Sequence, residues 1–108
     1  MALTHAQPLE VIDLRPLGPA LVNSKTTALV KAKQFEAVRL VLPAGKGIAA
    51  HSLNGEVTLL CLEGRVTLNA GKDIILKTGD WVYLDRGATH SLSAELDSSL
   101  LMTIHFDA

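Results

Sequence analysis

The chain has 108 residues, of which 48% are hydrophobic but only 4% aromatic, and its formal net charge is −1. This length suits a single domain with one hydrophobic core, which must be built mainly from aliphatic side chains. The near-neutral charge gives no indication that nucleic acid or an anionic membrane is a partner. No apolar run approaches the roughly 18 residues of a membrane helix, and no charged-then-apolar leader opens the chain. We therefore expect a cytoplasmic protein.

Two further bulk properties bear on compartment and assembly. Cys61 is the single cysteine, so an internal disulfide cannot form, which fits the reducing cytoplasm. The mean hydropathy of +0.29 is high for so small a chain. Burial of apolar surface against a second copy is therefore expected, and a homodimer is predicted.

The first 26 residues are predicted to form an N-terminal segment with a short edge strand. The apolar run 9–14 is the candidate strand, and Pro16 and Pro19 stop it within a loop. Residues 20–25 are compatible with another short strand or with an irregular edge. The remainder, residues 27–108, is predicted to be one barrel domain.

Short strands separated by turn residues follow one another about every 8–12 residues after position 27. In the stretch 35–42, for example, Val38, Leu40 and Leu42 share one face of a period-two pattern. The other strands are expected at 27–33, 57–62, 65–69, 73–77, 81–84, 89–94 and 99–106. Turns rich in Gly and Asp lie between them, and no segment carries a sustained helical stripe. This pattern predicts an all-β closed double sheet, a jelly roll.

Two strand-and-turn units each present one histidine. In residues 45–64 a glycine-bearing turn leads into His51, and a second turn and an apolar strand follow. In residues 79–94 a strand and a tight turn deliver His90. Two such units predict one pocket that receives a histidine from each side.

These units resemble the two motifs of the cupin superfamily. The first motif is Gly, five residues, His-x-His, three or four residues, Glu, six residues and Gly. The second is Gly, five residues, Pro-x-Gly, two residues, His, three residues and Asn. The residues that match here are Gly45, His51, Gly64, Gly79, Gly87 and His90. The resemblance covers residues 35–106 and implies a small single-domain cupin, with an RmlC-like jelly-roll barrel, or double-stranded β-helix.

The resemblance also implies that a divalent metal ion (Fe, Mn, Zn or Ni) binds in the barrel. Metal-bearing cupins take ligands from the two His and the Glu of the first motif and the His of the second. His51 and His90 are thus implied ligands, whereas Leu53 holds the second His slot and Val57 the Glu slot. Glu56 lies one position early, and a bulge at the preceding turn would bring it inward as a third ligand. Without such a bulge it is a solvated turn carboxylate.

Three functions remain open on these residues. The resemblance favours a metal-binding cupin that acts on a small organic molecule as a dioxygenase, isomerase or decarboxylase. The alternative is a metal-free binding or sensor module, whose aliphatic cavity and two histidines hold a small, mostly apolar ligand. Leu53 in a ligand slot is what this alternative predicts. The third is metal-free acid–base catalysis by a histidine, which needs a carboxylate partner.

Parity along two strands gives further expectations. Trp81 and Tyr83 alternate with Val82 and Leu84 and therefore share a face. A ligand pocket or a subunit contact would use them, but core packing is the preferred interpretation. On the last strand, the parity of His105 predicts that its side chain points away from the core.

Overall fold

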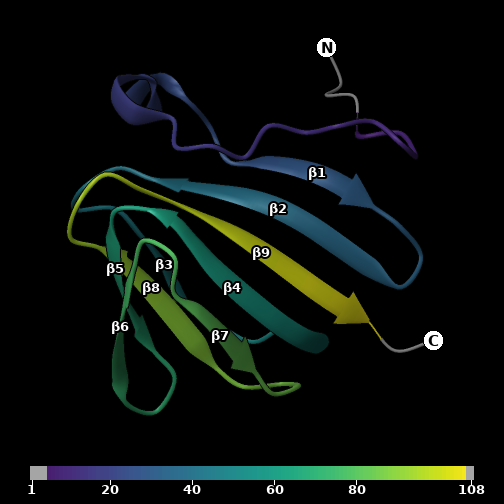
Figure 1. Ribbon diagram of the computed structural model, residues 1–108. Coiled ribbons are helices and arrows are strands. Elements are labelled where there is room, and N and C mark those ends of the chain that lie inside the picture. Colours follow the sequence, from purple (N-terminus) through teal and green to yellow (C-terminus); the bar gives the residue numbers. More distant parts are fainter. Residues whose placement is uncertain (1–4, 107–108) are drawn as a thin grey trace.

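The computed structural model describes residues 5–106, which form two antiparallel sheets that face each other (Figure 1). One sheet has five strands in the order β1-β2-β9-β4-β7, and the other has four in the order β3-β8-β5-β6. The strands are β1 (Thr27–Lys31), β2 (Phe35–Leu42), β3 (Gly47–His51), β4 (Gly55–Glu63), β5 (Arg65–Asn69), β6 (Asp73–Lys77), β7 (Trp81–Leu84), β8 (His90–Ala94) and β9 (Ser98–Phe106). The predicted jelly-roll fold is confirmed. Only β3 has no counterpart among the predicted strands, because its glycine and alanines carry a weak strand signal.

The core lies between the two sheets and is aliphatic, as the composition predicts. Along β4 the side chains alternate, and Val57, Leu59 and Cys61 point inward with exposures of 2%, 0% and 1%. Leu68 of β5 and Leu92 of β8 belong to the same cluster from the opposite sheet. The fully buried hydrophobic residues that the structure describes include no aromatic side chain.

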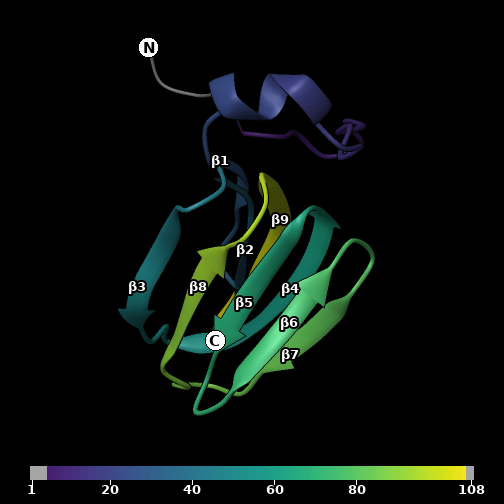
Figure 2. The same cartoon turned by 90° about the vertical axis from the view of Figure 1, so that its left-hand side faces the viewer.

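The short edge strand predicted for the N-terminal segment is not formed in residues 5–26. Three prolines in this stretch, Pro8, Pro16 and Pro19, lack the N–H that a strand ladder uses. Instead, Gly18–Asn23 forms a 3-10 helix, η1, with Pro19 in its first turn, where a fixed φ favours helix. Leu21 of η1 is 1% exposed, so its side chain is buried against the rest of the protein. Both views place η1 beyond one end of the two sheets (Figure 2).

No helix in residues 5–106 combines the length and the apolar character that spanning a membrane requires.

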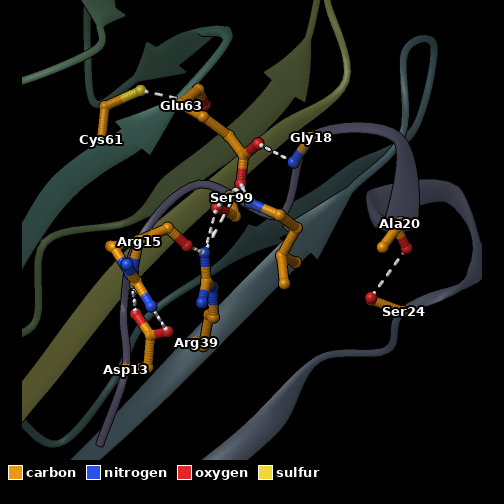
Figure 3. Close-up of polar contacts among 10 residues, drawn as sticks. Asp13, Arg15, Gly18, Ala20, Ser24, Arg39, Cys61, Glu63 and Ser99 are labelled. Carbon is orange, nitrogen blue, oxygen red and sulfur yellow. Dashed lines mark hydrogen bonds and ion pairs between the residues drawn. The ribbon is translucent and has the colours of Figure 1, made fainter.

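A carboxylate of β4 fixes the N-terminal segment to the sheet (Figure 3). Glu63 accepts hydrogen bonds from the N–H groups of Leu17 at 2.9 Å and Gly18 at 3.1 Å, and from Ser99 Oγ at 2.6 Å. Nη2 of Arg39 lies 3.5 Å from the same carboxylate and donates to a backbone carbonyl of the segment at 2.7 Å. Burial alone would raise the pKa of Glu63, but these donors and the Arg39 charge outweigh it and lower the pKa.

We call the face of the five-stranded sheet that points away from the core the outer face. A register shift between Cys61 and Glu63 places Glu63 opposite Ser99 of β9. A bulge of this kind reverses which side chains point outward. Residues 57, 59 and 61 of β4 point inward, and strict alternation would send residue 63 the same way. Because of the bulge, Glu63 points to the outer face instead. The N-terminal segment covers this end of the outer face.

Candidate functional site

The two strand-and-turn units bring His51 and His90 together. His51 ends β3, His90 begins β8, and the two residues stand opposite each other in the antiparallel pair. A register shift after Ile48 aligns them, because the extra residue of a bulge re-aims the side chains that follow. The ring centroids lie 4.6 Å apart, and the ring planes are tilted by 51°.

Each imidazole is oriented by a nearby backbone carbonyl. Nδ1 of His51 lies 3.0 Å from the oxygen of Ala49, and Nδ1 of His90 lies 3.1 Å from the oxygen of Ala88. Because a carbonyl only accepts, Nδ1 carries the proton in both rings, and Nε2 of the neutral ring presents a lone pair. Neither ring has a second hydrogen-bond partner in the part of the chain that the structure describes. Both Nε2 atoms are thus free to accept a donor or to coordinate an ion.

The pair lies at the mouth of the barrel and not in a cavity. His90 is 2% exposed and points inward with Leu92 and Ala94, whereas His51 is half-buried. Among the described residues, Nε of Arg39 is the one fully buried side-chain polar atom without a hydrogen-bond partner. The unpartnered Nε2 atoms of the two histidines therefore keep contact with solvent. Residues 5–106 form no pocket, since aliphatic side chains fill the space between the sheets. A ligand would therefore meet the histidines at the mouth.

Glu56 does not join the two histidines. The bulge that would turn it inward is absent, because β4 pairs with β9 in unbroken register from Gly55 to Cys61. Val57 points into the core, so its neighbour Glu56 points to the outer face. There its carboxylate accepts the hydroxyl proton of Tyr83 at 2.7 Å. The alternative interpretation of Glu56, a carboxylate at the surface, agrees with this geometry.

The two imidazoles are a suitable type of metal ligand, but two are fewer than a resident metal ion usually takes. Two imidazoles with Nδ1–H bound to a carbonyl have the orientation and tautomer of metal ligands. Leu53 packs against the core cluster and Val57 is part of it, and neither side chain offers a lone pair. No three His, Cys, Asp or Glu side chains among the described residues are placed to hold a metal ion. A resident transition-metal centre usually takes three or four protein ligands.

Trp81 and Tyr83 do not pack in the core, so the preferred interpretation of their parity is wrong. They are 61% and 48% exposed on the outer face at the edge strand β7. The hydrogen bond to the Glu56 carboxylate, with burial and the charges of Glu56 and Asp85, raises the pKa of Tyr83 to about 12. The prediction for His105 is confirmed: its side chain is exposed, opposite Glu56.

Two solved structures that match almost the whole chain share its fold. A conserved protein of unknown function from Streptococcus pyogenes is 17% identical, with a TM-score of 0.77 over 100% of this chain and 99% of its own. A cupin superfamily protein from Desulfitobacterium hafniense is 14% identical, with a TM-score of 0.75 over 91% of this chain and all of its own.

A third structure matches only part of a larger protein. A mutant of the salicylate 1,2-dioxygenase of Pseudoaminobacter salicylatoxidans is 22% identical over 67% of this chain and 22% of its own length, with a TM-score of 0.63. No protein-family model and no curated protein matches the sequence. At these identities the comparisons establish the fold.

Proposed function

Because the chain has the cupin fold, we propose that it is a small-molecule-binding cupin, with the His51–His90 pair as the polar centre of the site. The observation that carries this proposal is the free Nε2 on each anchored ring. Each Nε2 keeps contact with solvent, and water is its only partner there. A bound molecule with one or two hydroxyl or amine donors would replace this water with its own hydrogen bonds.

The residues in the remaining ligand slots support a metal-free site. Leu53 and Val57 stand where metal-bearing cupins have a histidine and a glutamate. Their aliphatic side chains can pack but cannot coordinate an ion. The expected ligand is accordingly small and mostly apolar, with its polar groups directed at the two imidazoles. Since the aliphatic core leaves no pocket among residues 5–106, this ligand lies across the mouth of the barrel beside His51.

A divalent metal ion held by the two Nε2 atoms is the second candidate. The contact of each Nδ1 with a carbonyl favours it, because such a bond fixes the ring orientation of metal-ligating histidines. With only two protein ligands, Fe, Mn, Zn or Ni would bind weakly, and water or an organic molecule would complete the coordination. A bound ion would supply Lewis-acid or oxygen chemistry of the dioxygenase, isomerase or decarboxylase type.

Acid–base catalysis without a metal has the least support. It needs a carboxylate that orients or receives a proton from one of the imidazoles. No carboxylate among the described residues lies in a cluster with the two histidines. Glu56 accepts a hydrogen bond from Tyr83 on the outer face instead.

Histidine side-chain NMR signals of the metal-free protein provide the test. Titrations with salicylate, with a panel of phenols and diols, and with Zn²⁺ are compared in wild type and in His90→Ala. His105→Ala is the matched control, because that imidazole is exposed elsewhere. We expect an organic molecule to shift the signals of His51 and His90 without metal, and to lose this effect in His90→Ala. Shifts that only Zn²⁺ produces would favour the second candidate instead.

The proposal also places the protein in the cytoplasm as a homodimer. Cys61 is a free cysteine with 1% exposure, and burial raises the pKa of its thiol. A protonated, buried thiol is unreactive and suits a reducing compartment. The net charge of −1 gives no reason to add nucleic acid or membranes as partners.

A further inference from the structure

A carboxylate on β2, that of Glu36, belongs to the inward face of the barrel. Along this strand Val38, Leu40 and Leu42 turn their side chains towards the core cluster, and Glu36 has the same parity. Its neighbour on β9 is Ile104, a core residue that is 5% exposed. Glu36 is half-buried. Charged side chains are mostly exposed, so a carboxylate on an inward face needs a particular reason.

One inward row crosses the five-stranded sheet at the level of Glu36. Ile104 stands opposite Glu36 on one side and opposite Val57 of β4 on the other. Val57 in turn stands opposite Leu84 of β7. Figure 1 shows β2, β9 and β4 side by side in this order. Val57 and Leu84 are 2% and 6% exposed, so the row is aliphatic core up to its carboxylate end.

Short loops join both histidines to this row. Residues 52–54 lead from His51, at the end of β3, to the start of β4. Residues 85–89 lead from Leu84, at the end of β7, to His90, the first residue of β8. The row and the histidine pair therefore lie at the same end of the barrel, on opposite sheets. The carboxylate stands across the mouth from the two imidazoles.

The separation between the carboxylate and the imidazoles suits an organic molecule better than an ion. No three His, Cys, Asp or Glu side chains among the described residues are placed to hold a metal ion, so Glu36 does not form a coordination site with the pair. Neighbouring strands lie about 4.8 Å apart and facing sheets about 10 Å apart. Since Glu36 is two strands away from Val57, a molecule that touches both polar groups spans on the order of 10 Å.

Glu36 has no partner of its own in the part of the chain that the structure describes. It forms no hydrogen bond or ion pair there. Lys31 of β1 stands opposite it in the register, but the Lys31 side chain is exposed and makes no ion pair with it. The carboxylate is thus available to a bound cation, for which Lys31 is the neighbouring competitor.

We propose that the site takes a small apolar molecule with a hydroxyl group at one end and a primary amine at the other. Nε2 of the histidine pair accepts the hydroxyl proton, and Glu36 binds the ammonium. This inference deepens the proposed function of the same site and rests on it. A hydrogen bond between an ammonium and a carboxylate is charge-assisted and about twice as strong as a neutral one. The aliphatic row between the two polar ends suits an apolar body.

Calorimetry with two matched pairs of ligands tests the inference. Tyramine is compared with 4-ethylphenol, which lacks only the amine. The second pair, 4-hydroxybenzylamine and 4-methylphenol, is one carbon shorter. At neutral pH we expect wild type to bind the amine of at least one pair about 5- to 20-fold more tightly than its neutral counterpart. Glu36→Gln should abolish this preference and leave the affinity for the phenols unchanged.

Three further variants define where the amine binds. Glu95→Gln is the matched control, because it removes the same charge just beyond β8 at the end opposite His90, and it should keep the preference. Lys31→Ala removes the neighbouring ammonium and should strengthen amine binding. His90→Ala should weaken both members of a pair equally, since both carry the hydroxyl group. Circular dichroism verifies that each variant is folded.

The results that would overturn the inference differ from those that would overturn the proposed function. Equal affinities of wild type for an amine and its counterpart in both pairs, or a preference that survives Glu36→Gln, would remove Glu36 from the site and leave the histidine site intact. Amine binding that is unchanged in His90→Ala would separate the amine site from the pair. If none of the four molecules binds or shifts the histidine signals, the inference fails together with the organic-ligand site on which it rests.

Discussion

The imidazole rings of His51 and His90 stand 4.6 Å apart across the paired strands β3 and β8. Each Nδ1 is bound to a backbone carbonyl, so both rings present Nε2. In the opposite sheet, the inward side chains of β4 begin with Val57, which adds no polar atom. Two anchored imidazoles without a carboxylate are equipped to recognise a ligand and poorly equipped to retain a metal ion.

Restoring the missing ligand types should create a stronger metal site. Leu53→His combined with Val57→Glu places an imidazole and a carboxylate at the two motif positions that now lack a metal ligand. We expect the Zn²⁺ affinity measured by calorimetry to rise at least about 100-fold, since each good ligand adds a few kcal/mol. Without metal, the carboxylate buried at position 57 of this variant should lower the free energy of unfolding by about 3–5 kcal/mol. Glu56→Gln is the control, and an equal effect of that change on Zn²⁺ affinity would contradict the outward orientation of Glu56.

Glu63→Gln should loosen the N-terminal segment and destabilise the protein. Its carboxylate accepts from Leu17, Gly18 and Ser99 and lies beside Arg39, so we expect a loss of about 2–4 kcal/mol near pH 7 in denaturant unfolding. The folded-state pKa is below the ordinary 4.5. The stabilisation is therefore full above pH 4.5 and is lost as the pH falls through the folded-state pKa.

The pH dependence of the free energy of unfolding tests whether Glu63 is an ionised, hydrogen-bonded carboxylate. The difference between wild type and Glu63→Gln should shrink as the pH falls below 4.5. Glu95→Gln is the control, because Glu95 forms an exposed ion pair with Arg65 at 3.5 Å, and such pairs contribute at most about 1 kcal/mol. A difference for Glu63 that stays constant from pH 7 to pH 3 would contradict an ionised, hydrogen-bonded carboxylate.

Tyr83 should titrate unusually late. It is the only tyrosine, so the ultraviolet absorbance of its phenolate near 295 nm reports it alone. The hydrogen bond to Glu56 raises the pKa of Tyr83 to about 12, and Glu56→Gln should return it towards 10.0. Asp85→Asn should have a smaller effect, because Asp85 accepts at 3.3 Å and not 2.7 Å. A wild-type midpoint near pH 10 in a rapid pH jump would show that the bond is not formed.

Gly64→Ala should be far more damaging than Gly71→Ala. Both glycines have positive φ, 92° and 91°, which costs a non-glycine residue about 1–3 kcal/mol. At Gly64 a Cβ would also collide with the side chain of Ser98 and the carbonyl of Asp97, whereas at Gly71 nothing lies within 4 Å. We expect thermal or chemical unfolding to show about 1 kcal/mol lost at Gly71 and several kcal/mol at Gly64. Equal losses would contradict the close packing of the β4–β5 turn on the start of β9.

The strand pattern of the barrel could be predicted because its signals are local. Period-two alternation and glycine turns define β2 and the strands from β4 to β9, and the motif spacing indicates that His51 and His90 converge. The orientation of Glu56 could not be read in this way. It depends on where β4 bulges against β9, and the bulge lies beyond Cys61 and not at the preceding turn. Such a register is decided by pairing between segments far apart in the chain.

Two other features lack a local signal. Trp81 and Tyr83 clearly share a face, but Val82 and Leu84 on the other face are also apolar, so parity alone does not decide which side is buried. The bond between Leu17 and Glu63 joins residues 46 positions apart, and nothing near either residue marks it. Sequence patterns specify the elements, whereas contacts between distant segments specify the surface of this protein.

Native mass spectrometry of the purified protein tests the central claim most directly, because it reports bound metal and bound organic molecules together. Wild type is compared with His51→Ala and His90→Ala after dialysis. We expect wild type to carry well below one metal ion per chain, and any retained small organic molecule to be lost in both variants. A wild-type mass with one divalent metal ion per chain, absent from both variants, would contradict the account and make the pair a resident metal site.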